Sequence, residues 1–377
     1  MDKHLHIVCL QVPYPPDYGG VIDLFWKLKY LRQQGISIYL HCFDDGRGAQ
    51  PALKEYCKEV FYYRRKKGIF SFSLSVPYMV RSRRSRQLER NLLKDNYPIL
   101  LEGIHCSYLL HKNKLPDRNV FIRLHNDEAA YYRQLATQTT ALFSRWYYLL
   151  ESLLLKKYEP ATIRKARAGF SVSRSETKSF TGKGLDNVDY LPLFLPWEDV
   201  QGVPGQGSFC LYHGNLSVEE NEKVAIWLIE QVFREPVSIF IIAGRNPTER
   251  LKRKITGFSH IRLIENPDME TMNTLIRDAH IHVLPSFSET GIKLKLLHAL
   301  FEGRFCITNP AMTAGSGLAP ACIIAGSAAV MKEKIAETLL TPFTAGDLAE
   351  RKKILLQTYD NIMTVKKLVS LIFGTIS

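Results

Sequence analysis

The sequence predicts an α/β protein of two consecutive domains, each a parallel sheet with helices wound on both faces. Its 377 residues are more than one ordinary hydrophobic core organises, and they fit two domains of common size. In both halves, short β-rich apolar runs alternate with segments of helical period. A stretch rich in Pro and Gly at 190–207 separates the halves. We therefore place one domain at 1–200, a second at 201–345 and a final helix at 346–377.

A strand, a loop and a helix open the first half. Residues 7–12 are apolar and β-rich, Pro and Gly at 13–20 exclude regular structure, and 24–34 have helical spacing that ends at Gly35. Residues 37–43 form the next strand. A strand–helix–strand unit of this size implies parallel strands with a right-handed crossover. Later elements are expected at 99–101 (strand), 120–124 (strand), 146–167 (helix) and 169–173 (strand). Glu151 and Glu159 are interpreted as surface residues of that helix.

The same alternation restarts after the linker. Its expected elements are a strand at 209–213, a helix at 219–233, a strand at 237–243, a basic helix, a strand at 261–264, a helix at 269–279, a strand at 281–284 and a helix at 292–301. Both halves thus read as doubly wound α/β domains. Ligands of such sheets bind beyond the carboxyl ends of the strands, so the functional residues should lie in the loops that follow them.

Charge and cysteine content narrow the function classes. The net charge is +13, and residues 1–180 hold 30 Lys and Arg against 16 Asp and Glu, so the whole excess lies in the first half. An anionic partner is therefore expected there. The seven cysteines are scattered and form no C-x-x-C pair, which predicts reduced thiols and no zinc site. With no signal peptide or spanning segment in view, we expect a cytoplasmic protein.

The segment 283–304 carries the strongest functional signal. A strand ends in Pro-Ser, and a turn containing Gly291 opens a helix with Lys293 and Lys295 in its first turns. Such a turn lets backbone approach an anion, and the N-terminus of the helix directs free N–H groups and a positive dipole end toward phosphate. The segment resembles the donor-site signature of family 4 glycosyltransferases (glycosyl transferases group 1), which reads G-x-x-x-K-x-L-E-A-M after a strand ending in Pro-Ser.

The resemblance continues upstream. Gly244 and Arg245 end a strand, as do the residues that face the donor diphosphate in this family, and Gly214 and Asn215 end the first strand of the second half. The resemblance implies the GT-B fold, in which two Rossmann-like domains face a cleft and a C-terminal helix crosses back to the first domain. The implied donor-binding residues are Gly19, Gly20, Gly214, Asn215, Gly244, Arg245, Thr290, Gly291, Ile292, Lys293, Lys295 and His298.

Two features depart from the family pattern. Many relatives carry Arg and Lys in the loop where this chain has Asn215 and Asn221, so the diphosphate clamp must rest on Arg245 with Lys293 or Lys295. His298 stands where the family has a Glu that accepts hydrogen bonds from the donor ribose. The choice of nucleoside is therefore left open.

In the first half, the loop 12–20 resembles the family's P-x-P-x-x-G-G, whose paired glycines approach the diphosphate and the acceptor. His125 follows a predicted central strand, in a segment similar to R-x-H-N-x-E-x-x-Y-Y of one branch. The resemblance places this His near the transferred sugar. We take His125, Arg245 and Lys295 as the catalytic candidates.

The implied activity is retaining transfer of a sugar from a nucleotide-sugar donor to a glycan or lipid-linked acceptor, typical of bacterial surface polysaccharide or glycoconjugate synthesis. No cofactor is required by this chemistry, and no D-x-D motif calls for a metal. A nucleotide-sugar epimerase of the same architecture is the alternative enzyme. A non-catalytic anion- or nucleic-acid-binding protein is a third reading, although no nucleic-acid motif is present.

A basic and aromatic stretch at 62–86 suggests a second partner. Tyr-Tyr-Arg-Arg-Lys-Lys precedes an apolar run at 68–74, and Arg81, Arg83, Arg84 and Arg86 follow it. Basic residues beside aromatic and aliphatic ones suit an anionic lipid interface. The stretch predicts peripheral contact with the inner face of the plasma membrane.

Overall fold

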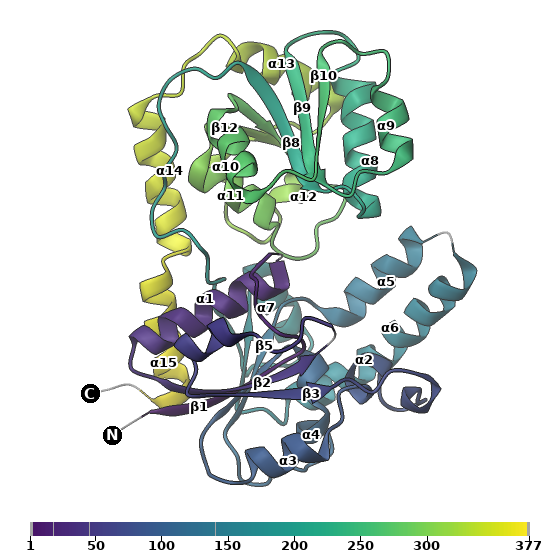
Figure 1. Ribbon diagram of the computed structural model, residues 1–377, viewed down its shortest axis with the longest axis vertical. Helices are drawn as coiled ribbons and strands as arrows, with labels where there is room; N and C mark the ends of the chain where they lie inside the picture. Colours follow the sequence, from purple (N-terminus) through teal and green to yellow (C-terminus); the bar gives the residue numbers. More distant parts are fainter. Residues whose placement is uncertain (1–2, 18, 45, 140, 375–377) are drawn as a thin grey trace. The chain divides into compact units, whose positions relative to one another are not determined.

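The computed structural model describes residues 3–17, 19–44, 46–139 and 141–374. The chain divides into two compact units, one formed by Met1–Pro196 with Asn361–Ser377 and the other by Trp197–Asp360. Each unit is a parallel β-sheet with helices on both faces, as the sequence predicts (Figure 1). Within the described residues, no helix combines the length and the apolar character needed to cross a membrane.

Unit 1 contains a seven-stranded sheet in the order β3-β2-β1-β4-β5-β6-β7, and all its neighbouring strands pair in parallel. Its strands are β1 (His4–Cys9), β2 (Ser37–Asp44), β3 (Glu59–Arg64), β4 (Ile99–Glu102), β5 (Val120–Leu124), β6 (Ala168–Ser171) and β7 (Val188–Tyr190). Its helices are α1 (Gly19–Gln33), α2 (Tyr78–Arg81), α3 (Arg86–Leu92), α4 (Tyr108–His111), α5 (Glu128–Gln138), α6 (Leu142–Ile163), α7 (Arg174–Gly182) and α15 (Asn361–Phe373).

Two hydrophobic clusters cover the faces of this sheet. One includes apolar residues of α1 and of α15, and the other packs α3 and α6 against β4 and β5. Val365, Leu368 and Ile372 of α15 are buried in the first cluster, which makes the last helix part of unit 1. Figure 1 shows α15 beside α1, whereas α5 and α6 form an antiparallel pair that projects away from the sheet.

Unit 2 contains a six-stranded parallel sheet in the order β10-β9-β8-β11-β12-β13. Its strands are β8 (Phe209–Asn215), β9 (Ile239–Arg245), β10 (Ile261–Glu265), β11 (Ile281–Val283), β12 (Phe305–Thr308) and β13 (Ile323–Ile324). Its helices are α8 (Glu219–Trp227), α9 (Glu249–Ile255), α10 (Met269–Asp278), α11 (Leu294–Glu302), α12 (Pro310–Thr313), α13 (Ala328–Thr338) and α14 (Ala345–Thr358).

The structure corrects several predicted elements. The first strand is His4–Cys9 rather than 7–12, because β1 pairs along its length with Ser37–Cys42 of β2. The sequence also missed β3 and β7 at the two edges of the sheet. The expected final helix is two helices, α14 and α15. Helix α14 ends at Thr358, and the hydroxyl of its C-cap residue Tyr359 donates to the carbonyl of Ser316 in unit 2.

Candidate functional site

The carboxyl ends of β8 and β9 lie side by side and bring four predicted residues together. Gly214 pairs with Gly244, and Asn215 pairs with Arg245. A Cβ atom added to Gly244 would lie 1.8 Å from the carbonyl oxygen of Gly214, so only glycine permits this close approach. Arg245 is the last residue of β9, and its side chain is exposed. The predicted Gly-Arg dipeptide thus presents a cation at the edge where ligands of such sheets bind.

Lys295 reaches this same strand end from the first turn of α11. Its Nζ lies 2.8 Å from Oδ1 of Asn221 and 3.2 Å from the hydroxyl of Tyr212. The Asn221 amide in turn donates to the carbonyl of Asn215 over 2.9 Å. Asn221 therefore supplies no charge to bind a diphosphate. It instead holds the ammonium of Lys295, on α11, at the end of β8.

Burial lowers the pKa of the Lys295 ammonium to about 8, against the opposing attraction of Glu220. Glu220 is itself engaged, because its Oε1 accepts a hydrogen bond from Ser286 Oγ over 2.7 Å. The ammonium of Lys295 faces hydroxyl and amide partners and the ring of Tyr212, whose centroid is 4.8 Å away. A partly buried cation with a lowered pKa would be stabilised by an anion placed beside it.

Lys293 behaves differently from Lys295, although the sequence treats the two alike. It is the N-cap residue of α11, and its Nζ donates to the carbonyls of Thr290 and Gly291 in its own loop. Gly291 has a φ of 69°, which accounts for glycine at this turn. Thr290 is fixed by a 2.9 Å contact between its hydroxyl and that of Ser288. Lys293 thus braces the turn that precedes α11, and Ile292 lies partly buried within that turn.

His298 lies one turn beyond Lys295 on α11. Its Nε2 is 3.5 Å from a carboxylate oxygen of Glu302, and its ring centroid is 5.0 Å from that of Trp197. The side chain keeps 22% exposure. A second histidine, His213, lies 6.0 Å from it between ring centroids.

His213, which immediately precedes Gly214 in β8, is not among the predicted site residues. It is buried, its Nε2 has no hydrogen-bond partner, and burial lowers its pKa well below the ordinary value, with His282, His298 and Lys295 adding to the effect. The imidazole is therefore neutral near neutral pH. Its position directly before the Gly214–Asn215 end of β8 was the available signal.

In unit 1, a network of buried charges lies under the loop that follows β5. Arg123 donates to both carboxylate oxygens of Asp23, over 3.1 and 3.2 Å. Lys27 donates to Asp23 over 3.0 Å and to Glu102 over 2.7 Å. Burial alone would raise the pKa of Asp23, but Arg123 and Lys27 more than offset it and hold this carboxyl ionised. The network ties α1 to β4 and β5.

His125 is the exposed end of this network. Its Nε2 is 3.3 Å from Oε2 of Glu102, and 19% of its side chain is exposed. Burial would raise the pKa of Glu102, but Lys27 and the hydrogen bond from His125 lower it below the ordinary value. Glu102 therefore stays ionised and orients the imidazole, a pairing that no sequence pattern revealed.

The oxygens of Asp23 and Glu102 and a nitrogen of His125 lie within 4.8 Å of one another, as ligands of a metal ion would. The ammonium of Lys27 already contacts both carboxylates at 3.0 and 2.7 Å. A cation is thus built into the group, and we assign no metal to it.

Gly19 and Gly20 are the exposed first residues of α1, the helix that carries Asp23 and Lys27. They follow β1 as His125 follows β5, so both lie on the carboxyl side of the sheet. The predicted site residues consequently form two groups, one in each unit.

Two acidic residues of α6 contradict the surface interpretation given to them. Glu151 is 2% and Glu159 1% exposed. Glu151 accepts hydrogen bonds from the backbone N–H groups of Tyr78 and Met79 at the start of α2, and Glu159 accepts one from that of Glu128 at the start of α5. Both carboxylates cap helices from the buried side of α6.

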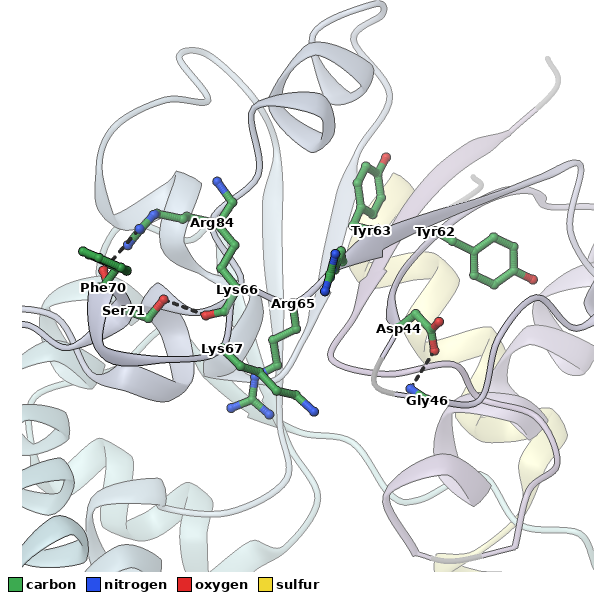
Figure 2. A pocket seen from close by; sticks show the side chains of 11 residues that line it. Asp44, Gly46, Tyr62, Tyr63, Arg65, Lys66, Lys67, Phe70, Ser71 and Arg84 are labelled. Atoms are coloured by element: carbon green, nitrogen blue, oxygen red, sulfur yellow. Dashed lines mark hydrogen bonds between the residues drawn. The ribbon is translucent and has the colours of Figure 1, made fainter.

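A basic pocket of about 900 Å³ opens elsewhere in unit 1, beside β3 (Figure 2). None of the predicted donor or catalytic residues lines it. Its lining includes four consecutive basic residues, Arg64 to Lys67, together with Phe70 and Arg84.

Comparisons with known proteins identify a family match and a related sequence. Residues 208–342 match the family described as Glycosyl transferases group 1. A relative from Klebsiella pneumoniae, described as an uncharacterized 44.6 kDa protein in the cps region, is 26% identical over 330 residues, which is 82% of this chain and 84% of that protein.

Two solved structures share the fold across nearly the whole chain. A variant of S. aureus TarM, in complex with fondaparinux, α-GlcNAc-glycerol and UDP, has a TM-score of 0.68 at 10% identity and covers 98% of this chain and 100% of its own. Anabaena Alr3699/HepE, in complex with UDP and glucose, has a TM-score of 0.60 at 11% identity and covers 98% of both chains.

Proposed function

Because residues 208–342 match the glycosyl transferases group 1 and the chain has the GT-B fold, we propose that it belongs to that family and is a retaining glycosyltransferase of hexosyltransferase type. It takes a sugar from a nucleotide-diphosphate-sugar donor and transfers it to a glycan or lipid-linked acceptor. The relative from the cps region supports a place in bacterial surface polysaccharide synthesis.

One observation carries the donor assignment: Lys295 is a partly buried ammonium held at the carboxyl end of β8, with Arg245 at the adjacent end of β9. Phosphate oxygens would receive charge-assisted hydrogen bonds there. As the bond to the nucleoside diphosphate breaks, negative charge grows on the leaving phosphate, and Lys295, Arg245 and the N-terminus of α11 would stabilise it.

Unit 1 supplies the acceptor-side residues in this proposal. Glu102 fixes the orientation of His125, so that the imidazole presents a defined polar edge to the transferred sugar or the acceptor. Gly19 and Gly20 leave the start of α1 without side-chain bulk, which permits close approach of a ligand. No carboxylate is assigned as a nucleophile.

The experiment is a ligand screen on the purified chain. Uridine, guanosine, adenosine and thymidine diphosphates should be compared by thermal unfolding, and we expect at least one to raise the melting temperature. Arg245→Ala and Lys295→Ala should reduce that rise, whereas Lys353→Ala, an exposed lysine of α14, serves as the matched control.

A panel of nucleotide sugars, each with and without candidate acceptors, then separates the enzyme classes. Release of nucleoside diphosphate that depends on an acceptor supports transfer. Conversion of the donor sugar without any acceptor would instead establish an epimerase. No stabilisation by any diphosphate at millimolar concentration would contradict the donor site.

A further inference from the structure

Large apolar side chains are exposed on two neighbouring segments of unit 1. In the loop 68–74, Phe70 is 82% and Leu74 88% exposed. On α6, Phe143 is 84% and Trp146 72% exposed. Single exposed apolar residues are ordinary, but a gathered set of this kind marks an interaction surface.

The α6 residues form one stripe along the helix. Exposed apolar side chains occur at Leu142, Phe143, Trp146, Leu150 and Leu153, and this spacing confines them to an arc of roughly 100°. The stripe ends at Lys157, four residues beyond Leu153, with an exposed cation.

The loop 68–74 is held in place by its backbone, with its apolar side chains left outside. Arg81 donates to the carbonyl of Phe72, and Arg84 donates to that of Phe70 over 3.3 Å. Ser71 Oγ donates to the carbonyl of Lys66 over 2.6 Å (Figure 2). Since these bonds fix the backbone, the apolar side chains project from an anchored turn.

The segment that carries the loop packs against α6, the helix of the stripe. The ring of Phe72 lies 6.4 Å from that of Tyr147 on α6, and the ring of Tyr78 lies 6.2 Å from it. Glu151 of α6 accepts hydrogen bonds from Tyr78 and Met79 at the start of α2, over 2.7 and 3.1 Å. These contacts join α6 to the segment that carries the loop.

Basic residues border the apolar loop. The 900 Å³ pocket beside it is lined by Arg65, Lys66, Lys67 and Arg84, and Phe70 is part of the same lining (Figure 2). A second pocket of about 600 Å³ shares Lys66 and Arg84 with the first. It adds three more basic residues, which are Arg86, Lys112 and Lys114.

We propose that this face of unit 1 docks on an anionic phospholipid bilayer. The loop 68–74 and the stripe of α6 enter the interface, and the bordering lysines and arginines contact lipid phosphates. Charge selects the bilayer over a second copy of the chain, because two such basic borders would repel each other. The proposal does not depend on the transfer reaction, but it would bring the acceptor side of a transferase to a lipid-linked substrate.

The structure changes which of the predicted arginines can contact lipid. Arg83 is 6% exposed and donates to the carbonyls of Leu10 and Met79, so it supports unit 1 from within and is excluded from the lipid set. Arg81 and Arg84 secure the loop. The exposed Lys66 and Arg86 are the informative positions for a test of charge.

The experiment is co-sedimentation of the full chain with vesicles of phosphatidylcholine alone and of phosphatidylcholine with phosphatidylglycerol, over a salt series. We expect binding that requires the anionic lipid and weakens as salt rises. Lys66→Gln with Arg86→Gln should lower the affinity roughly 25-fold, at about fivefold per cation. Phe70→Ser with Trp146→Ser should lower it about tenfold or more.

Matched controls come from unit 2. They are Leu340→Ser with Met269→Ser for exposed apolar residues, and Lys353→Gln with Arg250→Gln for exposed cations, and both pairs should bind vesicles as the unaltered chain does. The emission of Trp146 provides an independent readout, because it should shift to the blue on anionic vesicles and Trp146→Phe should remove the shift.

Three outcomes would overturn the proposal. The chain could stay in the supernatant with anionic vesicles at low salt. The four substitutions on this face could leave vesicle binding unchanged. Sedimentation velocity could instead show a dimer that Phe70→Ser with Trp146→Ser dissociates, which would make the face a contact between copies. Stabilisation by nucleoside diphosphates is measured separately, so its failure would not be confused with any of these.

Discussion

Replacing Lys295 by Met tests whether this ammonium is kept for a ligand at a cost to stability. Burial lowers its pKa from 10.5 to about 8, so the folded chain binds this proton less tightly than the unfolded chain does. The unfolded chain therefore holds more protons between about pH 8 and pH 10.5, and the free energy of unfolding should rise with pH across that window. Below pH 8 the full penalty of the buried charge applies.

The size of that penalty follows from the shift. At about 1.4 kcal/mol per pKa unit, the upper limit is about 3 kcal/mol. The Lys295 side chain is only partly buried, and Met forfeits the hydrogen bonds to Asn221 and Tyr212, so we expect a net gain of about 1 kcal/mol at pH 7. Met suits the change because it is similar in length and uncharged.

The assay is urea unfolding of the wild type and Lys295→Met from pH 7 to pH 10, with and without the diphosphate found by the screen. Burial also raises the pKa of several tyrosines and cysteines, including Tyr63 and Cys210, so the informative quantity is the difference between variant and wild type. That difference should fall as pH rises and turn against the variant once Lys295 of the wild type is neutral, and the diphosphate should stabilise the wild type more than the variant. A variant less stable than the wild type at pH 7, with undiminished ligand stabilisation, would refute the reasoning.

Further predictions concern the other charged groups. Burial raises the pKa of Glu128 to about 7, so the free energy of unfolding should fall as pH rises from about 4.5 to 7. Glu128→Gln should remove that fall and raise the free energy of unfolding at pH 8 by about 1–3 kcal/mol in urea titrations. His125→Ala should slow transfer roughly 100-fold while diphosphate stabilisation persists, and equal losses would point to another role. Arg245→Ala should weaken donor binding about 10- to 100-fold by calorimetry. Asp23→Asn should destabilise unit 1 by about 3–5 kcal/mol, since Arg123 would be left buried without its carboxylate, and unchanged unfolding would contradict the network.

The architecture could be predicted from the sequence because the periodicity of its elements and the composition of its linker are both local signals. Strand and helix periodicity and the Pro- and Gly-rich linker indicated two doubly wound domains, and the two parallel sheets confirm that fold class. The edge strands β3 and β7 were not predicted, because β3 is rich in Tyr and Arg and β7 has only three residues. Pairing at a sheet edge depends on a neighbour that local sequence does not identify.

The sequence could predict which residues form the candidate site, but not which side chains they contact. The pattern around Gly291 pointed to two lysines of equal standing, since spacing alone cannot show where a long side chain turns. In the structure, Lys293 folds back onto the carbonyls of its own turn, whereas Lys295 crosses to Asn221, 74 residues away in sequence. The contact of His125 with Glu102 is likewise long-range, and it depends on the pairing of β4 with β5.

The excess of positive charge in the first half illustrates the same distinction, and it bears on where an anionic partner can bind. Lys27 and Arg123 are buried against Asp23 and Glu102, so these two cations and two carboxylates cancel in the net charge and contribute nothing to the excess. The excess comes from other residues, among them the exposed Lys66 and Arg86, which line the two basic pockets of unit 1. We therefore expect an anionic partner of unit 1 to bind at these exposed cations and not at the buried cluster. Vesicle binding should respond to Lys66→Gln with Arg86→Gln, whereas transfer should respond to His125→Ala.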